Sequence, residues 1–441
     1  MTLNVNRAFL EKKSGEFEWF EKKLEQFGIE IISTNDFEDL FDLNGEILKA
    51  GGSDFDGLDL VAIELSERPT KLDENYILTS VEVWKYSIVY SAMKNYRNCV
   101  IIVDSDDFKH VIDSIDECGD VTLQDRRMLA LKAMYRLLRI NSLTHRELSE
   151  LFAAEKFETL ILEEITPLRY GENPHQYAHI SKVAKEAAFF DFLDEDQLFA
   201  MSYNNLIDLH LALNVVKNLK SDFVVRVHHG SVVDVVKKTF NFKNARGVMA
   251  TNFMNEELEK SLKESDLDLL ALPKGVKVKA RAKKIIEFDE EALTSTDKEY
   301  RFLDGNFLVQ GVDNLGKMRF SEDENDPQYR WANVIAALSN SMACCIFKDG
   351  EMISLGSGQP DQIDALEIAL MRAKRNSKDV SEAVFAFDGP IKDERVIERL
   401  AKIGSGTVIE PGGSKMDKVV KERLEKVKMK LIFTGKRRYR H

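Results

Sequence analysis

The stretch that decides the fold lies in the last third of the chain, where strand-like and helix-like segments alternate. It reads AVFAFDGPIKDERVIERLAKIGSGTVIEPGGSKMDKVVKERLEKVKMKLIFT (383–434). Short apolar runs predict strands at 383–387, 406–409 and 430–434, and the segments between them predict helices at 394–403 and 417–427. A βαβαβ run of this kind packs as a parallel sheet with helices on its faces.

Toward the amino terminus, the first 155 residues show the same alternation. Apolar runs predict strands at 29–34, 58–65 and 99–103, and helical periods predict helices at 17–27, 81–94, 123–138 and 145–152. This alternation indicates a second parallel sheet. Residues 156–167 are interpreted as a connection between domains. Beyond it we expect a helix at 205–220 and a strand at 223–227, and a charged segment at 279–299 that covers the surface between two subdomains.

The composition is that of an ordinary globular protein, and it narrows the range of partners. Of the 441 residues, 44% are apolar and 31% are charged, and the net charge is −13. Such a chain is a poor partner for nucleic acid or an anionic membrane surface, so an anionic ligand needs a local basic pocket. No stretch reaches the roughly 18 apolar residues of a membrane span. The first residues, MTLNVNRAFLEKK, contain no apolar signal region, so the expected location is the cytoplasm.

The cysteines and histidines do not indicate a metal site. The four cysteines form no CxxC pair, which argues against structural zinc. Cys344 and Cys345 lie inside an apolar run and are expected to be buried thiols. His175 and His179 share one segment, but no nearby carboxylate has the spacing of a metal ligand. We therefore expect no bound metal.

The string LRYGENPHQ (168–176) contains the most specific set of polar residues. Gly171 and the Asn-Pro pair that follows favour a tight turn, so Arg169, Tyr170 and His175 are expected on one compact loop. An arginine can bind a phosphate through two parallel hydrogen bonds, and a histidine can transfer a proton near neutral pH. The alternative is a surface turn with a solvated arginine.

Four shorter motifs also have structural explanations. In VRVHHG (225–230) two histidines end a predicted strand, a common place for ligands, although one could be a core residue and the other exposed. GSGQ (356–359) would let a ligand approach the backbone, but short glycine loops are common. PGGS (411–414) precedes a helix whose first N–H groups favour anions, or it is a plain turn. KRRYRH (436–441) either contributes to a site or is a solvated basic tail.

Taken in order, these motifs resemble AICAR transformylase/IMP cyclohydrolase, the bifunctional enzyme family of purine biosynthesis. LRYGENPHQ is a hallmark of that family, and the matches that follow it are SYNNLID (202–208), GVMATN (247–252), NFLVQGVD (306–313), Ser339-Asn340-Ser341, GSGQ and the ending IEPGGS with FTGKRRYRH. The resemblance covers about residues 165–441. It implies transfer of the formyl group of 10-formyltetrahydrofolate to the 5-amino group of AICAR.

The resemblance also implies the architecture and the ligands. The expected fold is α/β, with a small N-terminal parallel-sheet domain like methylglyoxal synthase at 1–155. Two formyltransferase subdomains like cytidine deaminase would follow at 160–300 and 301–441. The family works as an intertwined homodimer with composite sites. Its ligands are a nucleotide and the folate cosubstrate, without a metal.

Carried over by position, the family's functional residues fall into three sets. The nucleotide would be bound by Arg169, Tyr170, His175, Asn205, Arg437 and Tyr439, the folate by Asp268, Gln359 and Asp393, and the catalytic set would be His228, Asn340 and His441. Formyl transfer needs a group that takes the amine proton, a group that protonates the leaving nitrogen and donors for the oxyanion. His228 is the counterpart of the family's catalytic histidine, and Asn340 would orient the formyl oxygen.

The chain departs from the family pattern mainly on the folate side. The family has Lys-His where this chain has Val227-His228. With a gap, Arg226 would replace the lysine, but an arginine stays protonated and cannot easily donate a proton. Arg246 replaces a small residue, and Gln362 replaces an arginine after GSGQ. The family's FFPFRD reads DGPIKD (388–393), which removes aromatic area where folate would stack.

The first 155 residues resemble the cyclohydrolase domain only in outline, so we expect a degenerate domain without that activity. STNDFED (33–39) stands where the family has the glycine-rich STGGTAK, and its acidic residues would repel a phosphate. Ser66 lies near a family tyrosine, and Lys94-Asn95 is the main surviving pair. Two alternatives stay open: a nucleotide-binding paralogue without this activity, and a formyltransferase acting on a different amine.

Overall fold

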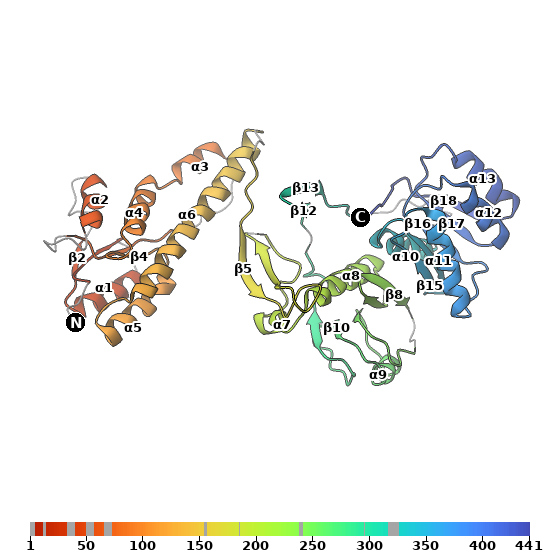
Figure 1. Ribbon diagram of the computed structural model, residues 1–441, viewed down its shortest axis with the longest axis horizontal. Helices are drawn as coiled ribbons and strands as arrows, with labels where there is room; N and C mark the ends of the chain where they lie inside the picture. The colour runs from red at the N-terminus through yellow and green to blue at the C-terminus, as the bar shows by residue number, and fades with distance from the viewer. Residues whose placement is uncertain are drawn as a thin grey trace. The chain divides into compact units, whose positions relative to one another are not determined.

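The computed structural model describes residues 5–11, 15–32, 40–49, 57–65, 73–153, 157–184, 186–237, 241–294, 296–315 and 326–441. STNDFED (33–39) and Ser66 lie outside these ranges. The chain forms two compact units, Met1–Ile161 and Leu162–His441, each with its own sheet and core (Figure 1). Within the described ranges, no helix has both the length and the apolar character needed to cross a lipid bilayer.

Unit 1 is built on a four-stranded parallel sheet in the order β2-β1-β3-β4. Its strands are β1 (Arg7–Leu10), β2 (Glu30–Ile32), β3 (Leu60–Ala62) and β4 (Val100–Ile102). Its helices are α1 (Glu16–Gln26), α2 (Leu40–Lys49), α3 (Glu74–Thr79), α4 (Val83–Lys94), η2 (Ser105–Asp107), α5 (Phe108–Cys118) and α6 (Leu123–Leu151). Helices cover both faces, as parallel sheets require.

Alternating side chains divide the core of unit 1 into two layers. Phe9, Val61 and Ile101 pack with α2, α4 and α6, whereas their neighbours along each strand pack with α1 and α5. The predicted parallel sheet is therefore confirmed. The two helices predicted at 123–138 and 145–152 are one helix, α6. That prediction was wrong because the polar residues between them include neither glycine nor proline, the residues that end helices.

Unit 2 is built on one ten-stranded mixed sheet in the order β11-β10-β9-β7-β8-β15-β14-β16-β17-β18. Its strands are β7 (Val224–His228), β8 (Ser231–Val236), β9 (Val248–Thr251), β10 (Leu269–Pro273), β11 (Ile285–Phe288), β14 (Cys344–Lys348), β15 (Glu351–Gly356), β16 (Val384–Phe387), β17 (Thr407–Glu410) and β18 (Lys430–Phe433). The three strands at each end are mutually parallel. The βαβαβ run predicted at 383–434 is therefore confirmed.

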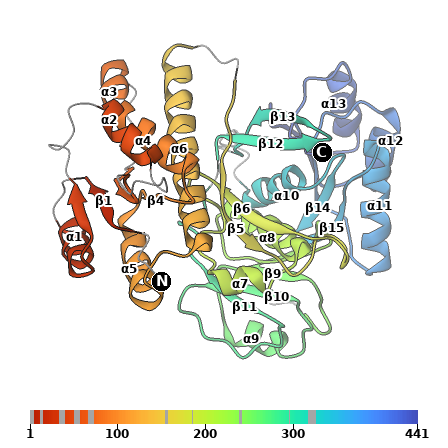
Figure 2. The ribbon, with the colours of Figure 1, turned by 60° about the vertical axis from the view of Figure 1, so that its left-hand side comes forward.

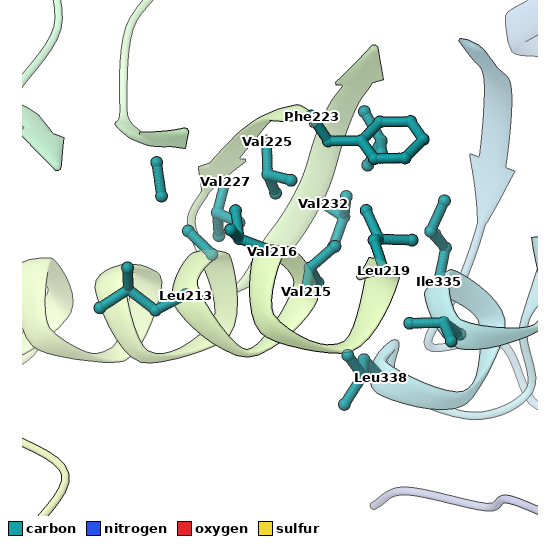
Figure 3. Close-up of a cluster of buried hydrophobic side chains, with 14 of the residues drawn as sticks. Leu213, Val215, Val216, Leu219, Phe223, Val225, Val227, Val232, Ile335 and Leu338 are labelled. Carbon is teal, nitrogen blue, oxygen red and sulfur yellow. The ribbon is translucent and has the colours of Figure 1, made fainter. Parts of the chain in front are cut away.

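Helices cover both faces of this sheet. They are α7 (Glu195–Phe199), α8 (Tyr203–Leu219), α9 (Glu256–Leu262), α10 (Pro327–Leu338), α11 (Gln362–Arg375), α12 (Glu394–Ile403) and α13 (Asp417–Lys426). Figure 3 shows Val216 of α8 and Ile335 of α10 in the same apolar cluster as Val225 of the sheet. On the other face, α11, α12 and α13 pack on β14, β16 and β17. Cys344 and Cys345 are buried thiols, as expected.

The two halves of this sheet have the same order of elements. In each half a helix (α8 or α10) precedes a hairpin (β7–β8 or β14–β15), and three mutually parallel strands follow beside it. Both hairpin turns consist of two residues with positive φ, His229-Gly230 and Asp349-Gly350, as in a type I′ turn. The halves join where β8 pairs with β15. The division into subdomains at residue 300 stays a prediction.

Two connecting segments differ from the prediction. The connection predicted at 156–167 contains the boundary between the units, but its second half forms β5 (Leu162–Pro167), which pairs with β6 (His179–Val183). The segment 279–299 is not only a surface cover, because it contains the edge strand β11 with Ile286 and Phe288 buried. The ribbon of β12 (Lys298–Leu303) and β13 (Asn306–Gly311) follows it (Figure 2), and its residues are exposed except for the partly buried Tyr300.

Candidate functional site

The loop that follows β5 is closed on itself by a glycine-dependent turn. Gly171 N donates to Gln176 O (2.9 Å), and Asn173 N donates to Gln176 Oε1 (2.8 Å). A Cβ at position 171 would stand 2.9 Å from the Cβ of Gln176, so a side chain has no room there. The predicted compact loop is therefore confirmed, and His175 is exposed on it.

Arg169 and Tyr170 lie where this loop docks on the start of α8. Arg169 N donates to Met201 O (2.9 Å), and Tyr203 N donates to Tyr170 O (3.1 Å). The guanidinium carbon of Arg169 lies 5.5 Å from the centre of the Tyr170 ring. Backbone hydrogen bonds thus fix the position of both residues at the amino-terminal end of a long helix.

A second cation reaches the same end of α8. Asn205 forms the capping box of this helix with Ser202, in which each side chain accepts from the other's backbone N–H (both 3.2 Å). Lys284, directly before β11, donates to Ala200 O. Burial, and then the charge of Arg169, lower the pKa of Lys284. Two neighbouring positive charges repel each other, so an arrangement of two cations beside a helix start favours the binding of an anion.

His228 ends β7 at the edge of the sheet where β9, β10 and β11 begin. Its partly exposed side chain lies on Gly247, where a Cβ would stand 3.0 Å from the imidazole Cδ2. Asp268, directly before β10, contacts residues that precede the two neighbouring strands, β9 and β11. Its Oδ2 accepts from Gly247 N (3.2 Å), and its Oδ1 lies 2.6 Å from Lys283 Nζ. The sheet edge therefore brings His228 and Asp268 together.

The turn after His228 is bound by a carboxylate from α8. Asp208 Oδ2 accepts from His229 N (3.0 Å), and its Oδ1 accepts from Gly230 N (2.6 Å). Desolvation, and then the neighbouring His229, lower the pKa of His228, while Asp208 and Asp268 act in the opposite direction. A neutral imidazole at neutral pH can accept a proton.

Neither candidate for the missing family lysine supplies a proton donor. Val227 is fully buried in the core between the sheet and α8. Arg226 has two partners: its Nε lies 2.5 Å from Asp234 Oδ2 of its own hairpin, and its Nη1 donates to Arg246 O before β9 (3.0 Å). Neither residue therefore replaces the lysine as a proton donor beside His228.

The last residues form a docked segment, so the reading as a solvated tail was wrong. Arg438 is 6% exposed, pairs with Asp313 and donates to Leu315 O (3.2 Å). Arg440 is tied to the segment before β14 in both directions: Ser341 N donates to Arg440 O (2.9 Å), and Arg440 N donates to Ser341 Oγ (2.9 Å).

Two loops meet beside this segment and bring two predicted residues together. Gly358 N donates to Asn340 O (2.7 Å), and Met342 N donates to Gln359 O (2.8 Å). The predicted SNS and GSGQ motifs are therefore neighbours, because SNS precedes β14, GSGQ begins at the end of β15, and these two strand ends meet at the open end of the hairpin. Gln359 Nε2 also donates to Ser357 O (2.9 Å), which stiffens its loop.

A buried aspartate organises the surroundings of these loops. Asp388 is 1% exposed, and its two oxygens accept from Ser341 Oγ (2.5 Å) and Ala343 N (3.0 Å). Its carbonyl accepts from Arg438 N (2.8 Å). Burial raises the pKa of Asp388, while the bonds from Ser341 and Ala343 oppose that shift.

The remaining predicted residues of the carboxyl-terminal segment lie side by side. The guanidinium carbon of Arg437 lies 4.7 Å from the centre of the Tyr439 ring, and the rings of Tyr439 and His441 are 6.1 Å apart. Burial, and then the charge of Arg440, lower the pKa of His210 on α8 to about 4. The carboxyl-terminal segment therefore also acts electrostatically on α8, the helix beside whose start Arg169 lies.

Two predicted anion or ligand sites are filled by the protein's own side chains. Asp393 caps α12 and pairs with Arg395 (2.5 Å), which lowers the pKa of Asp393. In the glycine-rich turn before α13, Gly413 N and Ser414 N donate to the two oxygens of Asp417 (2.7 and 2.8 Å). The structure therefore supports the plain-turn reading of PGGS.

In unit 1, the carboxyl edge of the parallel sheet is where open α/β folds bind ligands. Among the described residues, an ion-pair group lies at this edge. Lys85 of α4 is buried, lies 3.0 Å from Glu11 and 2.9 Å from Glu82, and donates to Glu64 O (2.9 Å). Asn95, of the surviving Lys-Asn pair, donates to a carbonyl of α2 (2.9 Å).

These contacts gather the predicted residues into two clusters that share α8. The loop cluster consists of Arg169, Tyr170, Asn205, His228 and Asp268, and the tail cluster consists of Asn340, Gln359, Arg437, Tyr439 and His441. His175 lies on the exposed part of its loop, and Asp393 lies at the start of α12. Within the described residues, no group of three or more histidine, cysteine or acidic side chains could hold a metal ion.

Comparison with known proteins gives the family. A family model described as the AICARFT/IMPCHase bienzyme matches residues 92–245. The bifunctional purine biosynthesis protein PurH of Persephonella marina is 29% identical over 430 residues, which cover 87% of this chain and 82% of that protein. Over most of its length the chain is similar to proteins of the AICARFT/IMPCHase family. The resemblance in the motifs is therefore confirmed.

Other AICARFT/IMPCHase relatives match over similar lengths. The PurH proteins of Bacillus cytotoxicus and Clostridioides difficile are each 28% identical, covering 82% and 87% of this chain and 77% and 82% of their own length. Among solved structures, the crystal structure of ForH covers 34% of this chain and 99% of its own, at 19% identity and a TM-score of 0.27. That structural likeness is too weak to support an inference.

Sequence reasoning missed three side chains that organise the candidate site: Asp208, Lys284 and Asp388. Asp208 falls in the apolar stripe of α8, in line with buried residues four and seven positions later, and a charge in such a stripe was a usable signal. Lys284 directly precedes an alternating strand, and Asp388 directly follows one. Each could have been found by asking which charged residues adjoin buried elements.

Proposed function

We propose that this chain transfers the formyl group of 10-formyltetrahydrofolate to the 5-amino group of AICAR in purine biosynthesis. The observation that carries the proposal is the loop cluster. Arg169 and Lys284 offer two cations beside the start of α8, which suits the phosphate of a ribonucleotide. His228 stands at the sheet edge that Lys284 adjoins. The names of the PurH relatives support the substrate class.

In this proposal His228 acts as the general base. The AICAR amine attacks the formyl carbon, a new C–N bond forms, and His228 takes the amine proton. Asn340 orients the formyl oxygen as negative charge develops on it. The bond between the formyl carbon and N10 of the folate then breaks, and N10 takes up one proton. Desolvation lowers the pKa of His228, which keeps the imidazole neutral and able to accept the proton.

The tail cluster would complete the site. Arg437 would share the phosphate, and Tyr439 and His441 would close the nucleotide pocket, while Gln359 would face the folate. Asp268 and Asp393 stay candidates for the folate side. Binding by Asp393 requires that its pair with Arg395 opens. Part of the same proposal is the finer architecture, a methylglyoxal-synthase-like domain followed by two cytidine-deaminase-like subdomains.

The substitution that tests this function removes the base. We expect H228N to lower kcat about 10²- to 10⁴-fold, the usual range for loss of a general base. H229N is the matched control, because His229 is exposed and its positive φ (52°) suits asparagine. Turnover is followed by the release of tetrahydrofolate. Equal rates for H228N and wild type would contradict the assignment of the base.

We also infer that the chain is a homodimer. The β12–β13 ribbon carries exposed apolar side chains, Phe302, Leu303, Phe307, Leu308 and Val309. A two-stranded ribbon with such a surface is only marginally stable in water, so a second copy of the chain would bury it. Arg301 of the same ribbon donates to His441 O, which ties it to the tail cluster. Sedimentation of wild type and F302D/L308D tests this, and a wild-type monomer would refute it.

Unit 1 is proposed to lack cyclohydrolase activity. Lys85 and its acidic partners occupy the sheet edge where a ligand would bind. Removing the buried lysine would take the cation away from the mostly buried carboxylate of Glu11 rather than open a pocket. Given formyl-AICAR, the protein is expected to form no IMP above the uncatalysed rate. Enzyme-dependent IMP, measured by chromatography, would overturn this part of the proposal.

A second candidate is a nucleotide-binding paralogue without formyl transfer. It is favoured by two observations: Val227 replaces the family's lysine with a buried apolar side chain, and Asp393 is paired with Arg395. In that case AICAR would raise the melting temperature, but no tetrahydrofolate would be released. Turnover of another amine under the same conditions would support a formyltransferase with a different acceptor.

A further inference from the structure

The two hairpins at the centre of unit 2 provide an internal comparison. Both turns have two residues with positive φ, and both are contacted by the helix that precedes the hairpin. In the second half the contact is one neutral hydrogen bond, from Gly350 N to Gln328 Oε1 of α10 (3.3 Å). The fold therefore makes this turn without a buried charge.

In the first half the same place is taken by Asp208. Its side chain is 6% exposed, and it accepts from both turn amides, His229 N (3.0 Å) and Gly230 N (2.6 Å). Burying a carboxylate is unfavourable unless its oxygens are well bonded. Because the other turn forms without one, the need to make a turn does not explain this carboxylate. The residue directly before the turn also differs between the halves: it is His228 in the first and Lys348 in the second.

We propose that Asp208 is a positioning residue for His228, and that its carboxylate fixes the turn that sets where the imidazole meets the acceptor amine. This rests on the proposed function of His228. Two strong bonds on consecutive amides leave the end of β7 little freedom, and Gly247 limits the imidazole from the other side. A base must be placed within hydrogen-bond reach of the proton it takes.

Asp208 also acts on His228 through its charge. The groups that act electrostatically on His228 are Asp208 of α8, His229 of the turn, Asp268 before β10 and Arg226 of β7. Desolvation is the largest influence and lowers the pKa of His228, and Asp208 opposes it. Replacing Asp208 by a neutral residue would therefore lower the pKa of His228 further. A residue that only stabilised the hairpin would not move this titration.

The experiment uses the full chain and compares D208N, D208E and the matched control D234N. Asp234 lies on the same hairpin but pairs with Arg226 on the strands, away from the turn. The ring signals of His228, assigned through H228N, are titrated by NMR, and kcat and KM for AICAR are measured across pH. The titration needs no turnover, so it stands even where formyl transfer fails.

The expected results separate charge from position. D208N should lower the pKa of His228 and reduce kcat about 100-fold, as a displacement near 1 Å can do, with a much smaller change in KM. D208E should keep the charge, so kcat falls while the pKa stays near that of wild type. D234N acts on His228 only through Arg226, so it should change the pKa of His228 and kcat much less than D208N does. If D208N leaves the His228 titration and kcat as they are in D234N, the proposal is wrong. A wild type without turnover would refute the proposed function instead.

Discussion

The ring of Tyr439 occupies the space in which a side chain at Gly389 would stand. A Cβ at position 389 would lie 2.2 Å from Tyr439 Cε1 and 2.4 Å from its hydroxyl oxygen. The loop after β16 and the carboxyl-terminal segment are therefore in direct contact through this glycine. Asp388, the residue before it, accepts from Arg438 N and so holds the same segment from the backbone side.

We expect G389A to displace Tyr439 and weaken the tail cluster. Arg437 lies over the Tyr439 ring, so it would move as well, and kcat/KM for AICAR should fall tenfold or more, roughly the effect of misplacing a binding group. G45A is a suitable control, because a Cβ at Gly45 meets nothing within 4 Å. Unchanged kcat/KM in G389A would show that Tyr439 has no role in the site.

Arg437 is expected to contribute to binding of the nucleotide phosphate. R437A should weaken AICAR binding about 10- to 100-fold, since hydrogen bonds to charged groups contribute about 1.5–3 kcal/mol. Arg423, an exposed cation of α13, serves as the control for net charge. Calorimetry with AICAR measures both variants. Equal affinities for R437A and R423A would remove the carboxyl-terminal segment from the phosphate site.

Glu410 should make the stability of unit 2 depend on pH. It is fully buried, its Oε2 accepts from Ile391 N (2.7 Å), and its Oε1 has no hydrogen-bond partner among the described residues. Burial raises the pKa of Glu410 to about 7, from an ordinary value of 4.5. As pH rises from about 4.5 to about 7, the carboxyl group of Glu410 loses its proton in the unfolded state but keeps it in the folded state. The free energy of unfolding therefore falls, by up to about 3 kcal/mol.

The substitution E410Q should abolish this pH dependence, because glutamine stays neutral while its oxygen can still accept from Ile391. Urea unfolding at pH 5 and pH 8 should show a loss of stability in wild type and in E398Q, whose substituted residue is exposed on α12. In E410Q the loss should be absent. A pH dependence in E410Q like that of wild type would mean that Glu410 is ionised in the folded protein.

The fold was most predictable where apolar runs are short and separated by glycine or capping residues. The helix predicted at 394–403 agrees with α12 at both ends, because Asp393 caps its start and Gly404 adopts the left-handed conformation after it. β11 was missed because an edge strand keeps charges along it: its burial alternates, and lysines precede it. The composition of residues 279–299 therefore resembles that of a surface segment.

The residues of the candidate site could be named from the sequence, but their arrangement could not. Arg169, Asn340 and the carboxyl-terminal segment were found because each sits in a specific string. Asp208 was missed because its partners, the amides of the turn after β7, lie 21 and 22 residues away. Contacts of this kind depend on how α8 crosses the sheet, which no local pattern contains.

The most direct test of the central claim is transfer of a labelled formyl group. Purified protein is incubated with AICAR and 10-formyltetrahydrofolate that carries the label in its formyl carbon, and the products are separated by chromatography. We predict that wild type moves the label into formyl-AICAR at a rate that H228N lacks and H229N keeps. Label that stays in the folate or appears only as free formate, at equal rates in all three proteins, would contradict the account.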